Sequence, residues 1–303
     1  MIDFIGDIHG HADKLEALLK KLGYTFNAGS YSHPERKILF VGDYIDRGPK
    51  IRETLDIVRR MVENENAIAL MGNHEYNAIC FHYPEKEGGH LRNHEIKNIL
   101  QHIKTLEQFQ NKQEEYNEYI DWFKTLPLYY ETGNVRAVHA CWDYKTISYL
   151  QSVLSDTKLT DDLIYESAIK GTKINEAIEI TLKGKEITMP EGLDFTDKDG
   201  AIRKEIRIKW WEDLSICTYK EISVEPLKNL PDVSVDKSQI TNLDFYSDSD
   251  KPVFFGHYWL RGNPTLYRGN ICCLDYSVAK EGYLVAYRFD EERKLDSRKL
   301  VYV

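Results

Sequence analysis

Short apolar runs alternate with amphipathic stretches in the first third of the chain. Residues 2–5, 37–41 and 67–71 are short and mostly apolar, which is the pattern of strands buried in a sheet. Residues 11–22 and 51–62 place apolar side chains at helical spacing, so each is expected to form an amphipathic helix. Strand, helix, strand, helix and strand in this order predict a parallel sheet covered by helices.

The later part of the chain predicts further strands separated by two long insertions. The charged and polar residues 82–126 carry a narrow apolar stripe and predict a helical insertion. The irregular pattern of residues 150–250 predicts a cap-like insertion, with a helix over 161–182. A hairpin turn is expected at 133–134 and another at 269–270, because both are Gly-Asn pairs. The strands expected here are 128–131, 135–138, 252–255, 265–268, 271–274 and 283–289.

These elements predict an α/β fold in which two sheets pack face to face with helices outside. The parallel half comes first, and antiparallel strands are expected to follow it. Because no internal repeat or long linker divides the chain, residues 1–303 are expected to form one domain. Apolar residues make up 42% of the chain, which is enough to fill a core.

The net charge of −9 restricts the kinds of partner that the chain can take. An excess of acidic residues, 49 against 40 basic ones, argues against a stable nucleic-acid complex, which needs a basic face. A phosphorylated substrate is still allowed, because bound metal ions can outweigh a negative surface locally. No stretch approaches the roughly 20 apolar residues of a membrane span, so no membrane partner is expected. Five cysteines without CxxC spacing and the lack of an apolar leader predict a reducing, cytoplasmic setting.

Polar residues with metal-binding side chains stand at the ends of five apolar runs. Because the carboxyl ends of strands gather at one edge of a sheet, these residues are expected to meet although they are far apart in sequence. Four of them directly follow a glycine, which permits tight turns and close backbone approach. The insertion at 82–126 is expected to wall one side of this edge. The candidate ligands are Asp7, His9, Asp43, Asn73, His139 and His257.

This set of side chains indicates a centre for two divalent metal ions. Carboxylate and amide oxygens together with imidazole nitrogens suit hard or borderline metals. Asp7 and His9 are two residues apart and therefore face the same side of an extended segment, and Asp43 is suited to bridge two ions. Manganese is the favoured metal, with iron, zinc, cobalt and nickel as alternatives. Paired ions of this kind clamp a phosphoryl group for in-line displacement.

Three residues beside the ligands are candidates for the chemistry itself. His74 adjoins Asn73 and is free to protonate a leaving oxygen. Asp46 is expected to hydrogen-bond to His74, which would fix its tautomer and favour its charged form. Arg47 carries a planar guanidinium that suits bidentate contact with phosphate oxygens.

The full set of motifs resembles the calcineurin-like metallophosphoesterase superfamily. The Asp46-Arg47-Gly48 extension and the lone His of Gly256-His257-Tyr258 resemble its phosphoprotein phosphatase branch. Within that branch the chain is similar to lambda-phosphatase-like and symmetrical diadenosine tetraphosphate hydrolase-like enzymes. The resemblance covers residues 1–80, 119–143 and 252–289. It rests on Gly6-Asp7-Ile8-His9-Gly10, Gly42-Asp43, Gly72-Asn73-His74-Glu75, His139 and Gly256-His257.

The resemblance implies a four-layer α/β/β/α sandwich and a hydroxide, bridging two metal ions, that attacks phosphorus in line. It implies that His74, paired with Asp46, protonates the leaving group and that Arg47 binds phosphate. The ligands it implies for one ion are Asp7, His9 and Asp43, and for the other Asp43, Asn73, His139 and His257.

The branch also has a second phosphate-binding arginine between its last two histidine ligands. Arg203 and Arg207 fall in that window, and Arg261 lies just after it. Arg207 is favoured because the Trp210-Trp211 pair offers it a packing surface, but a surface ion pair would explain this residue equally well.

The substrate is left open by the sequence, because the segment that would bind it is the least legible part. A Ser/Thr protein phosphatase, with dual specificity as an extension, is the favoured interpretation and would need an open groove. A dinucleoside polyphosphate or nucleotide hydrolase is the alternative and would need a closed aromatic pocket. A non-catalytic phosphate-binding module is disfavoured, since no ligand or acid residue is missing. In each case the partner is a phosphorylated molecule, either a phosphoprotein or a nucleotide.

Overall fold

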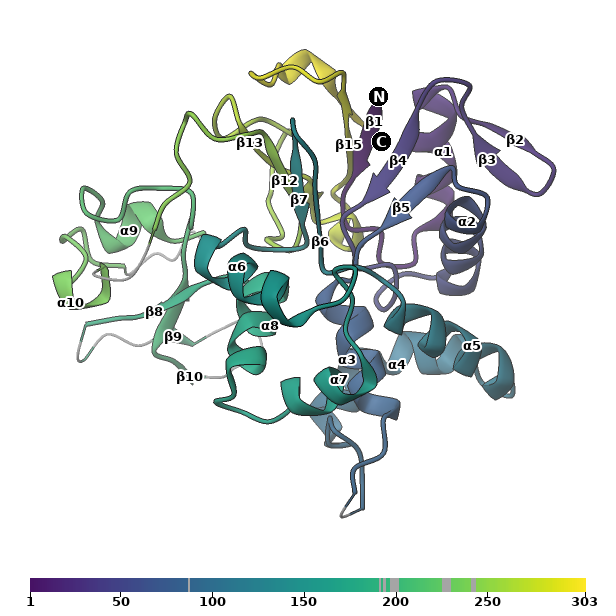
Figure 1. Cartoon of the computed structure of the whole chain (residues 1–303), viewed down its shortest axis with the longest axis horizontal. Coiled ribbons are helices and arrows are strands. Elements are labelled where there is room, and N and C mark those ends of the chain that lie inside the picture. The colour runs from purple at the N-terminus through teal and green to yellow at the C-terminus, as the bar shows by residue number, and fades with distance from the viewer. Residues whose placement is uncertain (87, 191, 193–194, 197–201, 225–229, 241–243) are drawn as a thin grey trace.

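A computed structural model of the chain describes residues 1–303 apart from 87, 191, 193–194, 197–201, 225–229 and 241–243. Two main sheets form its centre, and helices lie on their outer faces (Figure 1). That every residue from 1 to 303 belongs to one domain stays a prediction. Within the described residues, no helix is both long and apolar enough to cross a bilayer.

The first sheet has the order β14-β15-β1-β4-β5, with β16 added beside β15. Its parallel half is β1, β4 and β5, which confirms the predicted strand–helix alternation. The later strand β15 joins this sheet antiparallel to β1, so that the end of the chain pairs with its beginning. The bounds are β1 Ile2–Ile5, β4 Lys37–Phe40, β5 Ala67–Ala69, β14 Asp275–Tyr276, β15 Tyr283–Phe289 and β16 Leu300–Tyr302.

The second sheet has the order β13-β12-β7-β6. Its central strand β12 runs parallel to both neighbours, so the expectation that the late strands are all antiparallel is wrong here. The predicted hairpin of β6 and β7 is present and antiparallel. The bounds are β6 Tyr129–Glu131, β7 Arg136–Val138, β12 Val253–Phe255 and β13 Ile271–Cys273.

The two sheets pack face to face through alternate residues of their strands. Phe4 of β1 and Phe254 of β12 stack with ring centroids 4.0 Å apart in the middle of this layer. Their neighbours Ile5 and Phe255 point the other way and pack under the outer helices. Because strand side chains alternate between faces, each strand contributes to two cores at once.

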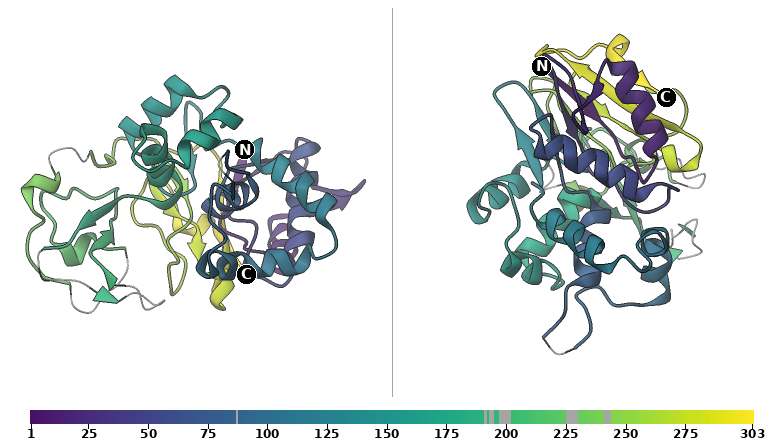
Figure 2. Two further views of the ribbon diagram at one scale, coloured as in Figure 1. Left: turned by 90° about the horizontal axis from the view of Figure 1, so that it is seen from below. Right: turned by 90° about the vertical axis from the view of Figure 1, so that its right-hand side faces the viewer.

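Helices cover both outer faces, which gives the α/β/β/α sandwich that the sequence predicted. Two of them, α1 (Ala12–Leu22) and α2 (Ile51–Glu63), bury their apolar stripes on the first sheet. On the other side α6 (Tyr144–Val153) and α8 (Lys173–Lys183) pack near the second sheet (Figures 1 and 2).

The predicted insertion at 82–126 contains two helices that fold back toward the strand ends. These are α4 (Ile96–Gln108) and α5 (Gln113–Lys124), and they follow α3 (Asn73–His82). Helix α5 packs against α3, while α4 contacts α2. The expectation that this insertion walls one side of the site is confirmed by its contacts, described below.

The segment between α6 and β12 departs most from the sequence prediction. The single helix expected over 161–182 is two helices, α7 (Asp161–Ser167) and α8, since Gly171 takes a left-handed φ of 82° between them. The elements further along are β8 Glu186–Thr188, β9 Phe195–Thr196, β10 Ile202–Arg203, β11 Glu205–Arg207, α9 Tyr219–Ile222 and α10 Lys237–Ile240. Of these, β8, β11 and α9 enclose a small separate apolar core. Strand β8 and helix α9 lie at the end of the molecule opposite α1 and α2 (Figure 1).

Two further differences concern short strands. The strand predicted over 265–268 is absent, and only a single bridge joins Arg268 to Ile271. The hydroxyl of Tyr276 accepts the N–H of Thr265 and donates to its carbonyl, so these backbone groups are not available for pairing with another strand. The hairpin of β2 (Thr25–Asn27) and β3 (Ser30–Ser32) was not predicted, because its strands are too short and polar to give a pattern.

Candidate metal centre and active site

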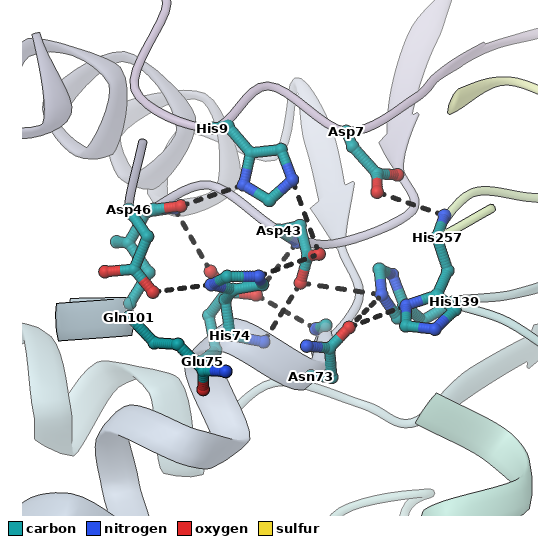
Figure 3. Close-up of polar contacts among 12 residues, drawn as sticks. Asp7, His9, Asp43, Asp46, Asn73, His74, Glu75, Gln101, His139 and His257 are labelled. Carbon is teal, nitrogen blue, oxygen red and sulfur yellow. Dashed lines mark hydrogen bonds and ion pairs between the residues drawn. The ribbon is translucent and has the colours of Figure 1, made fainter. Parts of the chain in front are cut away.

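The six predicted ligands meet where the carboxyl ends of strands from both sheets come together (Figure 3). Asp7 and His9 follow β1, and Asp43 follows β4. Asn73 is the first residue of α3, which starts just after β5. The last two, His139 and His257, follow β7 and β12 of the second sheet. The packing of the two sheets therefore assembles a set of residues spread over 250 positions.

The backbone around these residues is tightly turned. Gly42 has a φ of 115°, a conformation that side chains with a Cβ rarely adopt. A Cβ at this position would lie 2.7 Å from Cα of Gly72 and 2.8 Å from Nδ1 of His139. Only glycine therefore lets the loop after β4 approach α3 and β7 closely enough to bring their ligands together.

One group of ligand atoms gathers around the side chain of Asn73. Its Oδ1 lies 3.1 Å from Nε2 of His139 and 2.7 Å from Nδ1 of His257. Asp43 completes the group, with Oδ1 3.5 Å from Nε2 of His139. The Nδ1–H of His139 donates to the carbonyl of Val41, which leaves Nε2 with its lone pair toward the group.

A second group of ligand atoms lies near Oδ2, the other carboxylate oxygen of Asp43. Nε2 of His9 is 3.7 Å from Oδ2 of Asp43, and Nδ1–H of His9 donates to the carbonyl of Ile45. Asp7 lies beside them and accepts the backbone N–H of His257 on Oδ2, so its Oδ1 is left over. Asp43 thus stands between the two groups, as a bridging carboxylate must.

The chemistry of these atoms fits two divalent cations. Among the described residues, Asp7 Oδ1, His9 Nε2 and His257 Nε2 are buried and have no hydrogen-bond partner. Burial lowers the pKa of His9 to about 4, so its ring is neutral and able to ligate. Burial and the nearby carboxylates Asp275 and Asp43 raise the pKa of Asp7 well above its usual range. A cluster of buried carboxylates of this kind calls for positive charge, and bound cations would supply it.

His74 and Asp46 form the predicted pair. Nδ1 of His74 lies 2.5 Å from Oδ2 of Asp46, and Nε2 of His74 faces Asp43 at 3.9 Å. Burial alone would lower the pKa of His74, but Asp43 and Asp46 outweigh it and raise the pKa to about 9. Although His74 is also near enough to the second ligand group to ligate, its bond to Asp46 makes Nε2 the atom that presents a proton.

Sequence reasoning missed two residues of α4 that hold Asp46. Nδ1 of His102 lies 2.8 Å from Oδ1 of Asp46, and the hydroxyl of Thr105 donates to the same oxygen at 2.5 Å. His102 does not stand at a strand end, which is where the sequence predicts the site. The only available signal was its spacing of three from Thr105, which puts both on one helix face.

Glu75 braces the loop after β4. Its carboxylate accepts the backbone N–H groups of Gly72, Asp43 and Tyr44 at 2.8–3.0 Å. Because Glu75 lies in the first turn of α3, it ties the loop that carries Asp43 to the helix that carries Asn73 and His74.

The two predicted phosphate-binding arginines come from different elements and act on different histidines of the centre. Arg47 is exposed, with its guanidinium 5.4 Å from the ring of Trp259. Its charge adds a small effect to the burial that lowers the pKa of His9, and it only partly offsets the carboxylates that raise the pKa of His74. Arg207 of β11 is near enough for its charge to lower the pKa of His257, after the larger effect of burial. Its Nε also lies 3.6 Å from Glu186, so the ion-pair alternative is present too.

The two other arginines that the sequence left open are not brought to the centre by any described contact. The side chain of Arg203 lies outside the described residues, and Arg261 is exposed.

A cavity of about 150 Å³ opens beside the metal centre. Its walls come from the start of α3, the loop after β4, helix α4 and the loop after β12. Asn73, His74 and His257 face it from the metal side. The metal centre, the His74–Asp46 pair and Arg47 therefore all border one cavity.

Comparison with known proteins agrees with this arrangement. The calcineurin-like phosphoesterase family profile matches residues 1–266. A symmetrical bis(5'-nucleosyl)-tetraphosphatase of Neisseria meningitidis serogroup A is 32% identical over 301 residues, which cover 95% of this chain and 92% of that protein.

Other relatives match over shorter stretches. The asymmetrical bis(5'-nucleosyl)-tetraphosphatase PrpE of Halalkalibacterium halodurans is 48% identical over 73 residues, 24% of this chain and 30% of that protein. The corresponding protein of Oceanobacillus iheyensis is 32% identical over 143 residues, 46% of this chain and 54% of that protein. The chain therefore matches about a third to a half of the length of these two relatives.

Among solved structures, a protein serine/threonine phosphatase from Saccharomyces cerevisiae aligns with a TM-score of 0.51 and 16% identity. The alignment covers 100% of this chain and 78% of that one, and it shows a common fold. Because the family profile spans most of the chain, and the fold and ligand set agree with it, the protein belongs to the calcineurin-like phosphoesterase family.

Proposed function

We propose that this protein is a metal-dependent hydrolase of dinucleoside polyphosphates. The observation that carries the proposal is a two-group metal centre bordering the same cavity as the His74–Asp46 pair. The substrate class follows from the near full-length similarity to a symmetrical bis(5'-nucleosyl)-tetraphosphatase. The sequence favoured a protein phosphatase and held this class as the alternative; the similarity to that relative now favours the nucleotide.

In this proposal the chain holds one ion with Asp7, His9 and Asp43. It holds the other with Asp43, Asn73, His139 and His257, the group around the Asn73 amide oxygen. When bound, the two ions supply positive charge at the phosphoryl oxygens and lower the pKa of water. Manganese is the favoured metal, and iron, zinc, cobalt and nickel suit the same mixed oxygen and nitrogen ligands.

The chain's own residues handle the leaving group. Water adds to phosphorus and releases a proton to solvent, the bond from phosphorus to the bridging oxygen breaks, and that oxygen receives the proton of His74 Nε2. Solvent then returns a proton to His74. Asp46 holds Nδ1 of His74 at 2.5 Å, which fixes the ring so that Nε2 faces the reacting group. In this proposal Arg47, from the loop after β4, and Arg207, from β11, contact the non-bridging oxygens of the phosphate.

Trp259 gives the site a feature that suits a nucleotide. The centre of its indole ring lies 5.2 Å from that of the His9 ring. The guanidinium of Arg47 and the ammonium group of Lys280 lie over the indole, 5.4 and 4.7 Å from its centre. An aromatic ring next to cationic side chains is a surface on which a base and its phosphates can both find contacts. The five cysteines are all free thiols, which fits the reducing, cytoplasmic setting that we propose for the enzyme.

Product analysis of metal-stripped protein reconstituted with Mn²⁺ tests this function. The substrates are diadenosine tetraphosphate, p-nitrophenyl phosphate and phosphoserine, phosphothreonine and phosphotyrosine peptides, with His74→Asn as the control that should keep metal and lose turnover. Preference for the dinucleotide supports the proposal. Turnover of peptides alone would make the protein a protein phosphatase, and metal binding without any turnover would leave only the phosphate-binding module.

A further inference from the structure

We propose that Arg92, held by Asn77 and Gln101, binds a second phosphate group of the substrate, next to the one that is attacked. The inference rests on the proposed function and narrows it, because such a subsite selects a chain of phosphates over a phosphate monoester. Arg92 lies in the segment between α3 and α4, outside the motifs that the family resemblance covers.

The side chain of Arg92 is fixed by two neutral partners. One terminal nitrogen donates to Oδ1 of Asn77 at 2.9 Å, and the other donates to Oε1 of Gln101 at 2.7 Å. Asn77 belongs to α3 and Gln101 to α4, so the guanidinium bridges two helices. Since a guanidinium has five N–H donors, others are left to meet a ligand in the cavity.

Among the residues that the structure describes, the lack of a carboxylate partner sets Arg92 apart from other buried or partly buried arginines. Arg36 lies 2.8 Å from Asp3, and Arg136 lies 2.9 Å from Glu131. Among the described residues, no carboxylate comes within ion-pair distance of Arg92, and burial lowers the pKa of its guanidinium. A partly buried cation held only by amides is costly unless an anion joins it.

The position of Arg92 shows which anion fits. Asn77 is one helical turn beyond Asn73 on the same face of α3, a rise of roughly 6 Å along the axis. Gln101 directly precedes His102, which holds Asp46. Arg92 therefore borders the cavity about one turn away from the metal ligands, on the side where His74 is placed to protonate the leaving oxygen.

A second phosphate of the substrate would lie in that place. In a phosphate chain the leaving oxygen is itself attached to the next phosphorus, so the leaving group carries charge that a monoester alcohol does not have. A planar guanidinium is well suited to phosphate oxygens, and Asn77 and Gln101 hold it ready before the substrate arrives. Orthophosphate esters of serine or of p-nitrophenol would leave this subsite unused.

Isothermal titration calorimetry of the Mn²⁺-loaded protein with ADP and with AMP, at matched free Mn²⁺, measures how much the added phosphate contributes to the affinity. We expect the wild type to bind ADP about tenfold or more tightly than AMP, the size of a charge-assisted hydrogen bond. Arg92→Gln should abolish most of that preference, while Arg92→Lys should retain part of it. The matched control Arg298→Gln removes an exposed arginine that pairs with Asp296, and should keep the wild-type ratio.

An unchanged ADP-to-AMP ratio in Arg92→Gln would overturn the inference. So would a wild type without preference for ADP. If Arg92→Gln does not fold, Gln101→Ala takes its place and should reduce the ratio by freeing the guanidinium. Because binding is measured rather than turnover, the result stays separate from the proposed function: a protein that fails to cleave diadenosine tetraphosphate still reports on the subsite.

Discussion

His102 holds Asp46 with Nδ1 2.8 Å from Oδ1, so the carboxylate that orients His74 is itself oriented from α4. The chain of contacts continues outward, because Nε2 of His102 lies 2.5 Å from the hydroxyl of Tyr116 on α5. A helical insertion that supplies no proposed metal ligand thus reaches the proposed proton donor through two hydrogen bonds. Outer partners of this kind keep a reactive group in one rotamer and one tautomer.

Replacing His102 by Asn should therefore lower kcat by about tenfold or more, as loss of such partners commonly does. KM should change little, because His102 touches Asp46 rather than the phosphate. Steady-state rates over a range of pH measure both effects, and the basic limb of the profile, where His74 loses its proton, should move. His33→Asn, at a half-buried histidine beside Tyr24, is the matched control. A rise in KM alone would show that His102 acts on substrate binding instead.

The glycine in the loop after β4 gives a prediction about stability. Gly42→Ala should destabilise the fold by about 2 kcal/mol or more, because alanine disfavours the positive φ and its Cβ would meet Gly72 and His139. Gly133→Ala is the matched control, since nothing lies within 4 Å of a Cβ there. Urea unfolding of both variants measures the difference. Equal stability of the two would mean that the loop relaxes without strain.

The sequence predicted the strand ends well because each ligand follows a local pattern of apolar residues and glycine. All six predicted ligands meet around Asp43, and the His74–Asp46 pair forms as expected. These predictions depend only on residues that are neighbours in sequence and on the rule that the carboxyl ends of strands gather at one edge of a sheet.

The parts that the sequence did not predict depend on contacts between distant residues. His102 reaches Asp46 across 56 positions, and no local pattern marks it as part of the site. The strand expected at 265–268 is lost to the hydroxyl of Tyr276, a tertiary contact that outweighs local propensity. Arg92 likewise stands in a polar loop, where an arginine is ordinarily a surface residue.

Removing the metal should destabilise the protein as well as inactivate it. Without cations, Asp7 and Asp43 are buried carboxylates next to Asp275, and their repulsion opposes folding. Chelation should lower the melting temperature, and added Mn²⁺ should raise it in a concentration-dependent way. Asp7→Asn should reduce this Mn²⁺ response. A melting temperature that does not change when Mn²⁺ is added would contradict the proposed metal centre.

A buried ion pair beside the loop after β7 gives a prediction about pH. Oδ1 of Asp143 lies 2.5 Å from Nζ of Lys185, and Oδ2 accepts the N–H of Thr146 as the cap of α6. Burial opposes the charged form of Asp143, but Lys185 and the Thr146 contacts outweigh it and lower its pKa. Asn at this position can still cap the helix, so Asp143→Asn removes chiefly the ion pair.

Because the folded pKa of Asp143 is depressed, its contribution to stability is complete above the unfolded pKa of about 3.9. It is lost as the pH falls through the folded pKa. At pH 7, Asp143→Asn should lower the free energy of unfolding by about 3 kcal/mol, since it leaves Lys185 buried and unpaired. The gap between wild type and variant should narrow below pH 4. Adding Lys185→Met should restore part of the loss, and denaturant unfolding at several pH values would show a constant gap if the pair contributed nothing.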